Sequence, residues 1–295
     1  MTAHRFYLPP EHGADPALRI EGREAHHALH VLRMKPGESV VVLDGVGHEI
    51  LCEAAEVSRE AVTLHVTQKI SIPPLPCQIT LLQALPRGKI IESIIQKSVE
   101  LGAHRIVPLL TDRVVTQLNE KDKASKRAKW KLVAIEAIKQ CGAAWLPKIE
   151  TPMTIQEFLL RRSAGLRPGA LEARHAGSET GAPDPEEESF AFDLSLVGSL
   201  QTDRRHPREC LQEFQAKHGH LPKSIGVWIG PEGDFTPGEL TTIQASGAQP
   251  ISLGPLVLRV ETAAIYCLSI LNYELQAAAV IESKRGKPGP DVPGA

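Results

Sequence analysis

The sequence predicts an α/β protein that carries a small all-β domain at its N-terminus. Three observations lead to this fold class. Runs rich in β-branched residues fill the chain up to about residue 70, a proline-rich stretch follows at residues 71–77, and strand-like and helix-like segments alternate beyond it. Such alternation is typical of a mostly parallel sheet. We therefore expect a small β-barrel at residues 1–72 and an α/β domain at residues 73–281.

The N-terminal domain has three expected strands, at residues 38–44, 48–54 and 61–68. Turn glycines in Asp44-Gly-Val-Gly47 separate the first two. A short helix is expected before them, over residues 23–33, because His26, Leu29 and Leu32 or Arg33 recur at helical spacing.

The C-terminal domain is expected to alternate strands and helices. The strands are at residues 78–84, 105–110, 190–197 and 227–229, and the helices at 88–101, 124–141 and 207–217. Two capping boxes, in Thr154-Ile-Gln-Glu157 and Thr236-Pro-Gly-Glu239, predict the starts of two further helices. Residues 163–188 break the alternation and are expected to be a flexible surface insertion, and residues 282–295 a disordered tail.

The overall composition is that of a soluble globular protein. Apolar residues make up 42% and charged residues 23% of the 295 residues, and no run of 18 apolar residues predicts a membrane span. The first residues lack the apolar core of a signal peptide. The five cysteines are far apart and form no C-x-x-C pair, so we expect no metal site and a reducing, cytoplasmic location, or an organellar one in a eukaryote.

Charge is segregated along the chain although the net charge is only −2. Residues 121–131 carry six bases, one acid and a tryptophan, whereas residues 171–188 carry six acids and one base. A basic block with an aromatic residue suits contact with a phosphate backbone. A solvated helix face explains the same pattern equally well, and both interpretations stay open.

Two loops of similar design indicate a ligand site. Val227-Trp-Ile-Gly-Pro-Glu-Gly-Asp-Phe235 and Leu253-Gly-Pro-Leu-Val-Leu-Arg-Val-Glu-Thr-Ala263 each lead from a strand end through Gly-Pro toward a helix. Open α/β sheets bind ligands beyond the carboxyl ends of their strands, so two such loops can wall one pocket. Each loop alone also fits a plain turn, with Arg259 and Glu261 as a surface ion pair. Neither a G-x-G-x-x-G nor a G-x-x-x-x-G-K-[ST] motif is present, which argues against ordinary dinucleotide or P-loop binding.

The sequence resembles the RsmE-type 16S rRNA (uridine-N3)-methyltransferases of the SPOUT class over nearly its whole length. The resemblance rests on Arg5-Phe6, His27 with Val31-Leu-Arg33, Ile95-Gln-Lys-Ser-Val-Glu-Leu-Gly102, Gly230-Pro-Glu-Gly233, Leu253-Gly254 and Leu258-Arg-Val-Glu-Thr-Ala263. It implies a PUA-like N-terminal barrel that holds RNA and a C-terminal domain with a deep trefoil knot. It also implies a homodimer, S-adenosylmethionine as cofactor and 16S rRNA of the small ribosomal subunit as substrate.

The resemblance also implies roles for particular residues. Cofactor contacts are expected from Leu196, Gly230, Pro231, Glu232, Gly233, Leu253, Gly254, Leu258, Thr262 and Ala263. RNA contacts are expected from Arg5, His27, Arg33, Lys126, Arg127 and Lys129. The chain departs from the family at Lys139-Gln-Cys-Gly-Ala143, where Glu-Gln-Ser-Gly-Arg is commoner, so an RNA contact through the final arginine is in doubt.

The expected catalytic residues are Arg259, Glu261 and Glu232. Uracil N3 becomes nucleophilic only as its proton leaves, and Arg259 would stabilise the resulting anion. Either glutamate would orient Arg259 or act as the base. Two alternatives are a related SPOUT enzyme that methylates a 2′-hydroxyl or a guanine, and a non-catalytic rRNA-binding assembly factor.

Overall fold

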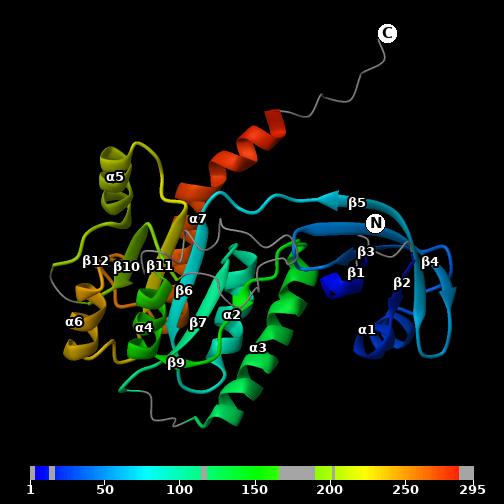
Figure 1. Cartoon of the computed structure of the whole chain (residues 1–295), viewed down its shortest axis with the longest axis horizontal. Helices are drawn as coiled ribbons and strands as arrows, with labels where there is room; N and C mark the ends of the chain where they lie inside the picture. Colours follow the sequence, from blue (N-terminus) through cyan, green and yellow to red (C-terminus); the bar gives the residue numbers. More distant parts are fainter. Residues whose placement is uncertain (1–3, 13–16, 114–117, 166–189, 201–202, 286–295) are drawn as a thin grey trace.

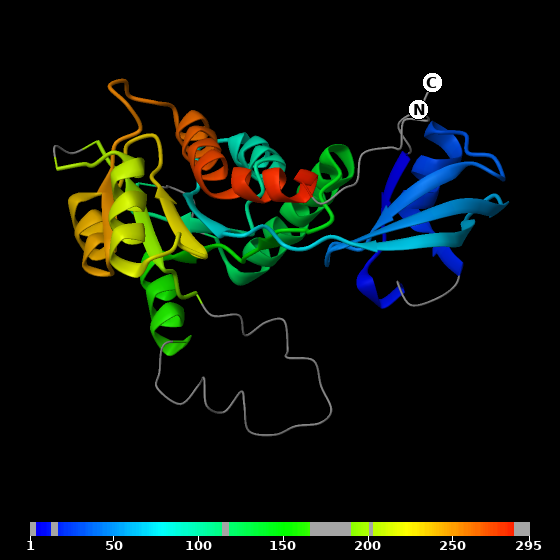
Figure 2. The ribbon, with the colours of Figure 1, turned by 90° about the horizontal axis from the view of Figure 1, so that it is seen from above.

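The protein contains two β-sheets, one near each end of an elongated molecule (Figures 1 and 2). A computed structural model describes residues 4–12, 17–113, 118–165, 190–200 and 203–285. The first sheet is formed by residues up to Ser71 and the second by residues from Gln78 onward. The proline-rich stretch predicted as a linker connects them.

The N-terminal sheet has five strands in the order β1-β3-β4-β5-β2. Its strands are β1 (His4–Tyr7), β2 (Ala17–Ile20), β3 (Ser39–Leu43), β4 (His48–Val57) and β5 (Val62–Ser71). The three predicted strands are confirmed as β3, β4 and β5. The terminal strands β1 and β2 do not pair with each other within the described residues, so the barrel is open along that edge.

The expected short helix is present as two successive turns of different kind. An α-helical segment, α1 (Gly22–His26), continues as a π-helical segment, η2 (His27–Val31), and a 3₁₀ turn, η1 (Pro10–His12), lies earlier in the chain. Arg33 follows in the left-handed region with φ +54°, which is uncommon for a residue other than glycine. Apolar side chains of α1, η2 and the five strands form a separate core that includes Phe6, Ala28, Val42 and Leu64.

The C-terminal sheet is wholly parallel and follows the order β12-β10-β11-β6-β7-β8, with β9 pairing β7. Its strands are β6 (Gln78–Ala84), β7 (Arg105–Leu110), β8 (Lys148–Ile149), β9 (Met153–Thr154), β10 (Leu194–Gly198), β11 (Ser224–Ile229) and β12 (Ala248–Ile251). The predicted parallel α/β arrangement is therefore confirmed. The trefoil knot stays a prediction.

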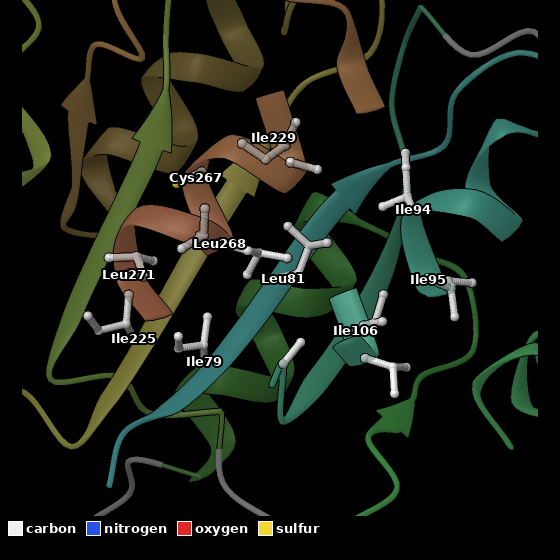
Figure 3. Close-up of a cluster of buried hydrophobic side chains, with 14 of the residues drawn as sticks. Ile79, Leu81, Ile94, Ile95, Ile106, Ile225, Ile229, Cys267, Leu268 and Leu271 are labelled. Carbon is white, nitrogen blue, oxygen red and sulfur yellow. The ribbon is translucent and has the colours of Figure 1, made fainter. Parts of the chain in front are cut away.

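Helices cover both faces of this sheet. They are α2 (Ile90–Glu100), α3 (Glu120–Cys141), α4 (Ile155–Gly165), α5 (Pro207–His218), α6 (Pro237–Ala245) and α7 (Val260–Arg285). Because side chains alternate along a strand, Leu81 and Ile225 pack with α2, α3, α5 and α7, whereas Leu82 and Trp228 pack with α4 and α6. Figure 3 shows the first of these cores, where Cys267, Leu268 and Leu271 of α7 lie over β11 and β6.

Three helix boundaries differ from the expected ones by three or more residues. Helix α3 begins at Glu120 rather than at residue 124, because the Asn119 side chain accepts a hydrogen bond from the Asp122 amide at 2.9 Å and caps the helix. Helix α4 continues to Gly165, so residues 163–165 of the expected insertion are helical; the rest of it, residues 166–188, lies outside the described residues. Helix α7 continues to Arg285, so residues 282–285 are helical and only residues 286–295 of the expected tail lie outside the description.

The C-terminal end of α3 joins the two sheets. Arg5 of β1 donates hydrogen bonds to the carbonyl oxygens of Lys139 and Gln140 at 3.3 and 3.2 Å. Lys139, one of the residues that depart from the family, is buried and pairs with Glu24 of α1 at 2.8 Å and with Glu136 at 3.3 Å. The departure therefore falls at a contact between the two halves of the molecule.

Candidate active site

The carboxyl ends of three adjacent parallel strands surround a cavity of about 470 Å³. Strands β12, β10 and β11 are neighbours, so the loops that follow them converge at one edge of the sheet. This is the edge at which open parallel sheets bind ligands, and the volume is in the range of small-molecule pockets. The lining residues are Ile90, Gly198, Ser199, Leu200, Arg204, Ile229, Gly230, Pro231, Glu232, Asp234, Leu253, Gly254, Leu256, Val257, Leu258, Arg259, Val260, Glu261 and Ala263.

Most of the residues predicted for the site lie in the wall of this cavity. The structure brings Gly230, Pro231, Glu232, Leu253, Gly254, Leu258, Arg259, Glu261 and Ala263 together there. Leu196 is instead fully buried in the core beneath the sheet. Gly233 and Thr262 do not line the cavity either. Gly233 lies against the Arg113 side chain, and Thr262 is exposed on α7.

Glycines fit the backbone conformation of each of the two predicted loops. A Cβ atom on Gly230 would lie 3.0 Å from an Asp234 carboxylate oxygen and 3.2 Å from the Phe235 amide nitrogen, so a side chain there would displace the loop. Gly254 has φ +109°, a conformation that strongly favours glycine. Asp234 in turn accepts hydrogen bonds from the amides of Phe235 at 2.8 Å and Leu200 at 3.4 Å, which connects the loops after β11 and β10.

Charged side chains surround the apolar walls. Arg259 is exposed and, within the described residues, forms no ion pair, with Glu261 or with any other carboxylate. The alternative of a surface ion pair between Arg259 and Glu261 is therefore wrong. Glu232 accepts a hydrogen bond from the backbone amide of Arg87 at 2.9 Å, so it connects the loop after β11 to the loop after β6.

Two further residues of the cavity were missed by sequence reasoning. Asp234 lies in the predicted loop at residues 227–235, and nothing in the sequence indicated that it connects the loops after β11 and β10. Arg204 lies in the loop after β10 and donates to the Ser199 carbonyl oxygen at 3.2 Å. No motif surrounds Arg204 in the sequence, and only the convergence of three strands places it at the site.

The residues predicted to contact RNA lie in two separate regions. Arg5, His27 and Arg33 belong to the N-terminal sheet and its helical segment, where Arg33 is exposed and Arg5 contacts the end of α3. On α3, Arg127 donates to the Ile149 carbonyl oxygen at 3.0 Å and Lys129 pairs with Glu92 at 2.6 Å. The structure directs Lys126 into a second cavity.

Within the described part of the chain, no helix is long and apolar enough to cross a membrane. The same residues contain no cluster of three or more histidine, cysteine, aspartate or glutamate side chains placed to hold a metal ion.

Comparison with known proteins identifies two family matches. Residues 73–272 match the family of RNA methyltransferase domains, and residues 20–67 match the RNA methyltransferase PUA domain. The predicted α/β fold with an N-terminal PUA-like domain is thereby confirmed.

Individual relatives agree with these matches. "Ribosomal RNA small subunit methyltransferase E" of Bacillus subtilis is 29% identical over 264 residues, which cover 88% of this chain and 91% of the relative. The protein of the same name from Synechocystis is 29% identical over 94% of this chain and 80% of its own length. A methyltransferase from Legionella pneumophila, solved with bound S-adenosylmethionine, superimposes with a TM-score of 0.73 at 27% identity, over 93% of this chain and 98% of that structure. The chain belongs to the RNA methyltransferase family.

Proposed function

We propose that this protein is an S-adenosylmethionine-dependent methyltransferase that methylates N3 of a uridine in 16S rRNA. The observation that carries this proposal is the cavity at the carboxyl ends of β10, β11 and β12, which lies within the matched RNA methyltransferase domain. Two kinds of relative support it: proteins named as small-subunit rRNA methyltransferases, and a structure that holds the cofactor. The expected homodimer, trefoil knot and cytoplasmic location belong to the same proposal.

The residues of the cavity fit S-adenosylmethionine. Leu253, Leu258 and Ile229 provide apolar walls for an adenine ring, and the glycines at 230 and 254 leave backbone groups open to its polar edge. Asp234 and Glu261 provide carboxylates for ribose hydroxyls and for a positively charged ligand. When bound, the cofactor supplies a methyl group on a sulfonium, which reacts by in-line displacement.

Arg259 is the residue best placed to stabilise a uracil anion. Its side chain lines the cavity and is not neutralised by any carboxylate in the described residues. A guanidinium presents donors in a planar fork, which suits the neighbouring nitrogen and oxygen acceptors of a deprotonated uracil. Fixed donors aimed at developing charge are usually the largest single contribution to such a reaction.

Glu232 is better placed than Glu261 to take the N3 proton. Its carboxylate is held by the Arg87 amide, and its side chain contributes to the walls of two adjoining cavities. Glu261 lies in the first turn of α7, where its negative charge interacts favourably with the helix dipole. We therefore assign Glu232 as base and Glu261 as a carboxylate of the cofactor cavity.

The product of the reaction tests this proposal. Small-subunit rRNA is incubated with the protein and labelled S-adenosylmethionine, digested to nucleosides and analysed by mass spectrometry. We expect 3-methyluridine. A labelled 2′-O-methyl nucleoside or methylguanine would establish the related-enzyme alternative, and rRNA binding without methylation would establish the assembly-factor alternative.

A further inference from the structure

A second cavity of about 270 Å³ adjoins the proposed cofactor cavity. Glu232 lines both, so the two cavities share one wall. The second cavity is formed by the loops after β6 and β11, the described part of the loop after β7, and helices α2 and α3. Its lining residues are Leu85, Pro86, Arg87, Gly88, Ile91, Arg113, Leu118, Lys126, Trp130 and Glu232.

Positive charge dominates this cavity. Arg87, Arg113 and Lys126 surround it, and none of them forms an ion pair within the described residues. Among the described residues that line the cavity, the single carboxylate is that of Glu232, which already accepts a hydrogen bond from the Arg87 amide. Arg113 uses one N–H group on the Asp234 carbonyl oxygen, at 3.3 Å, and a guanidinium has four more donors. Three cations therefore face the cavity with capacity for an anion.

The remaining walls are apolar. Leu85, Pro86, Ile91 and Leu118 contribute hydrocarbon surface, and the indole of Trp130 is buried beneath the cavity. The Lys126 ammonium lies over that indole, 5.8 Å from the ring centroid, and this contact holds its charge near the cavity. An apolar floor with a cationic rim matches a nucleotide, which combines a flat base with a phosphate.

Three of the other bases in the block at residues 121–131 contact groups within the protein. Lys123 pairs with Glu120 at 2.8 Å, Lys129 with Glu92, and Arg127 bonds the Ile149 carbonyl oxygen. Lys126 is the member of the block that lines the second cavity. Within the block, Lys126 therefore faces the second cavity, whereas Lys123, Arg127 and Lys129 contact neighbouring groups of the protein.

We propose that the second cavity is the subsite for the target nucleotide of the substrate RNA. The uracil ring would enter between the apolar walls and Glu232 with its N3 edge toward the first cavity, where Arg259 lines the wall, while Arg87, Arg113 and Lys126 bind the phosphates on either side of it. An enzyme that modifies a base must take that base out of its stack and hold it next to the reactive group. A pocket that shares a wall with the cofactor cavity meets this requirement. This inference rests on the proposed function.

Neutralising the three cations tests the subsite. The variant Arg87→Gln/Arg113→Gln/Lys126→Gln is compared with Arg161→Gln/Lys217→Gln/Lys223→Gln, which removes the same charge from exposed positions outside the cavity. The first variant should weaken binding of a fluorescent small-subunit rRNA fragment by on the order of 10–100-fold, and the slope of log K against log salt should fall by about two if the three contacts are to single-stranded RNA. The control should lose much less. Equal losses in the two variants would overturn the proposal.

Two further measurements separate this inference from the proposed function. The affinity for S-adenosylmethionine should be unchanged in Arg87→Gln/Arg113→Gln/Lys126→Gln. The variant Arg87→Gln/Arg113→Lys/Lys126→Gln, which keeps the charge at position 113, should bind RNA more tightly than this triple variant. Photocrosslinking of RNA that carries 4-thiouridine at the methylated position should label peptides that contain Arg87, Arg113 or Lys126. If the wild-type protein methylates rRNA but the crosslinks fall elsewhere, the subsite is wrong and the function stands. If crosslinks fall here but no methyl group is transferred, the subsite stands and the function is wrong.

Discussion

At the scale of single residues, Arg259 carries the chemical hypothesis. A sulfonium cofactor gains nothing from a nearby positive charge, whereas a uracil anion does. Arg259→Ala should therefore lower single-turnover methylation by about 10²–10³-fold. Cofactor affinity should change by less than about tenfold, which corresponds to 1.4 kcal/mol. Rapid-quench kinetics with a separately measured cofactor Kd would show both.

The lysine variant is the matched control for charge. Arg259→Lys should recover only part of the rate, because an ammonium is a point charge and cannot span two acceptor atoms. Loss of cofactor binding in Arg259→Ala, with a normal rate at saturating cofactor, would instead make Arg259 a cofactor residue.

The cysteines differ in ways that thiol labelling can measure. Cys141 is exposed, whereas the other four are buried. Burial raises the pKa of Cys77 and Cys267 to about 12 each and that of Cys52 to about 11. Since the thiolate is the reactive form, one thiol per chain should react promptly at about pH 8, and the other four only after unfolding.

Replacing the exposed thiol checks this assignment. Cys141→Ser should abolish the prompt label and leave methylation intact, because transfer to N3 needs no protein nucleophile. Prompt labelling of two or more thiols in the native protein would contradict the burial pattern.

At the scale of elements, the same capping-box motif begins helices α4 and α6, but its glutamate is exposed in one helix and buried in the other. In α4 the exposed Glu157 accepts from the Thr154 amide at 2.7 Å. In α6 the buried Glu239 accepts from the Thr236 amide at 2.8 Å and also from the Asp112 amide at 2.9 Å. Glu239 therefore also holds the loop that carries Arg113 into the second cavity.

Replacing each glutamate should separate these roles. Glu239→Ala leaves two amides without their acceptor and should cost about 2–3 kcal/mol, whereas Glu157→Ala should cost about 1 kcal/mol or less. Urea unfolding near pH 7 measures both. Equal costs would mean that the bond to Asp112 adds no stability.

The cost of the Glu157 variant should also depend on pH. Hydrogen bonding from the Thr154 backbone holds the pKa of Glu157 below its usual value, against a smaller opposing effect of burial. A lowered folded-state pKa contributes stability above the unfolded-state pKa, and that contribution is lost as pH falls through the folded-state pKa. The difference between wild type and Glu157→Ala should therefore shrink below about pH 4. A difference that grows in acid would contradict this assignment.

The helices and strands that could be predicted are those whose sequence pattern depends on only a few neighbouring residues. Both capping boxes and strands β6 and β7 were found at their true positions because spacing and β-branched composition are local. The short strands β1 and β2 were missed, since four residues carry too little alternation and their pairing is set by distant partners. Helix α3 began earlier than expected because Asn119 caps it through a side chain.

At the scale of the whole molecule, the first cavity was largely predictable and the second was not. Two loops in which a strand ends at Gly-Pro predicted the first cavity from the sequence. Arg87, Arg113 and Lys126 belong to three separate segments, and each looks like an ordinary surface cation. Only the order of strands and the bond from the Arg87 amide to Glu232 bring them to one place. For Arg5 the sequence predicted a contact with RNA, whereas in the structure its guanidinium donates hydrogen bonds to backbone carbonyl oxygens at the C-terminal end of α3.

Assembly is the last property that the surface predicts. Tyr266 and Tyr273 lie seven residues apart on one side of α7 and are 45% and 71% exposed. Leu256 and Val257, in the loop that leads into α7, are 75% and 77% exposed although they also line the cofactor cavity. A second copy of the chain that covers these groups would remove apolar surface from water and would also close the cavity. Light scattering should therefore give twice the chain mass of 32.1 kDa.

A charge placed on this surface should separate the copies. Tyr266→Glu/Tyr273→Glu should give the mass of a single chain and weaken S-adenosylmethionine binding, because Leu256 and Val257 would lose the surface that covers them. Leu160→Glu is the matched control: Leu160 is 70% exposed but lies on α4, across the sheet from α7, so the mass and the cofactor affinity should stay as in the wild type. A wild-type protein that is monomeric and still binds the cofactor tightly would show that one chain completes the site alone.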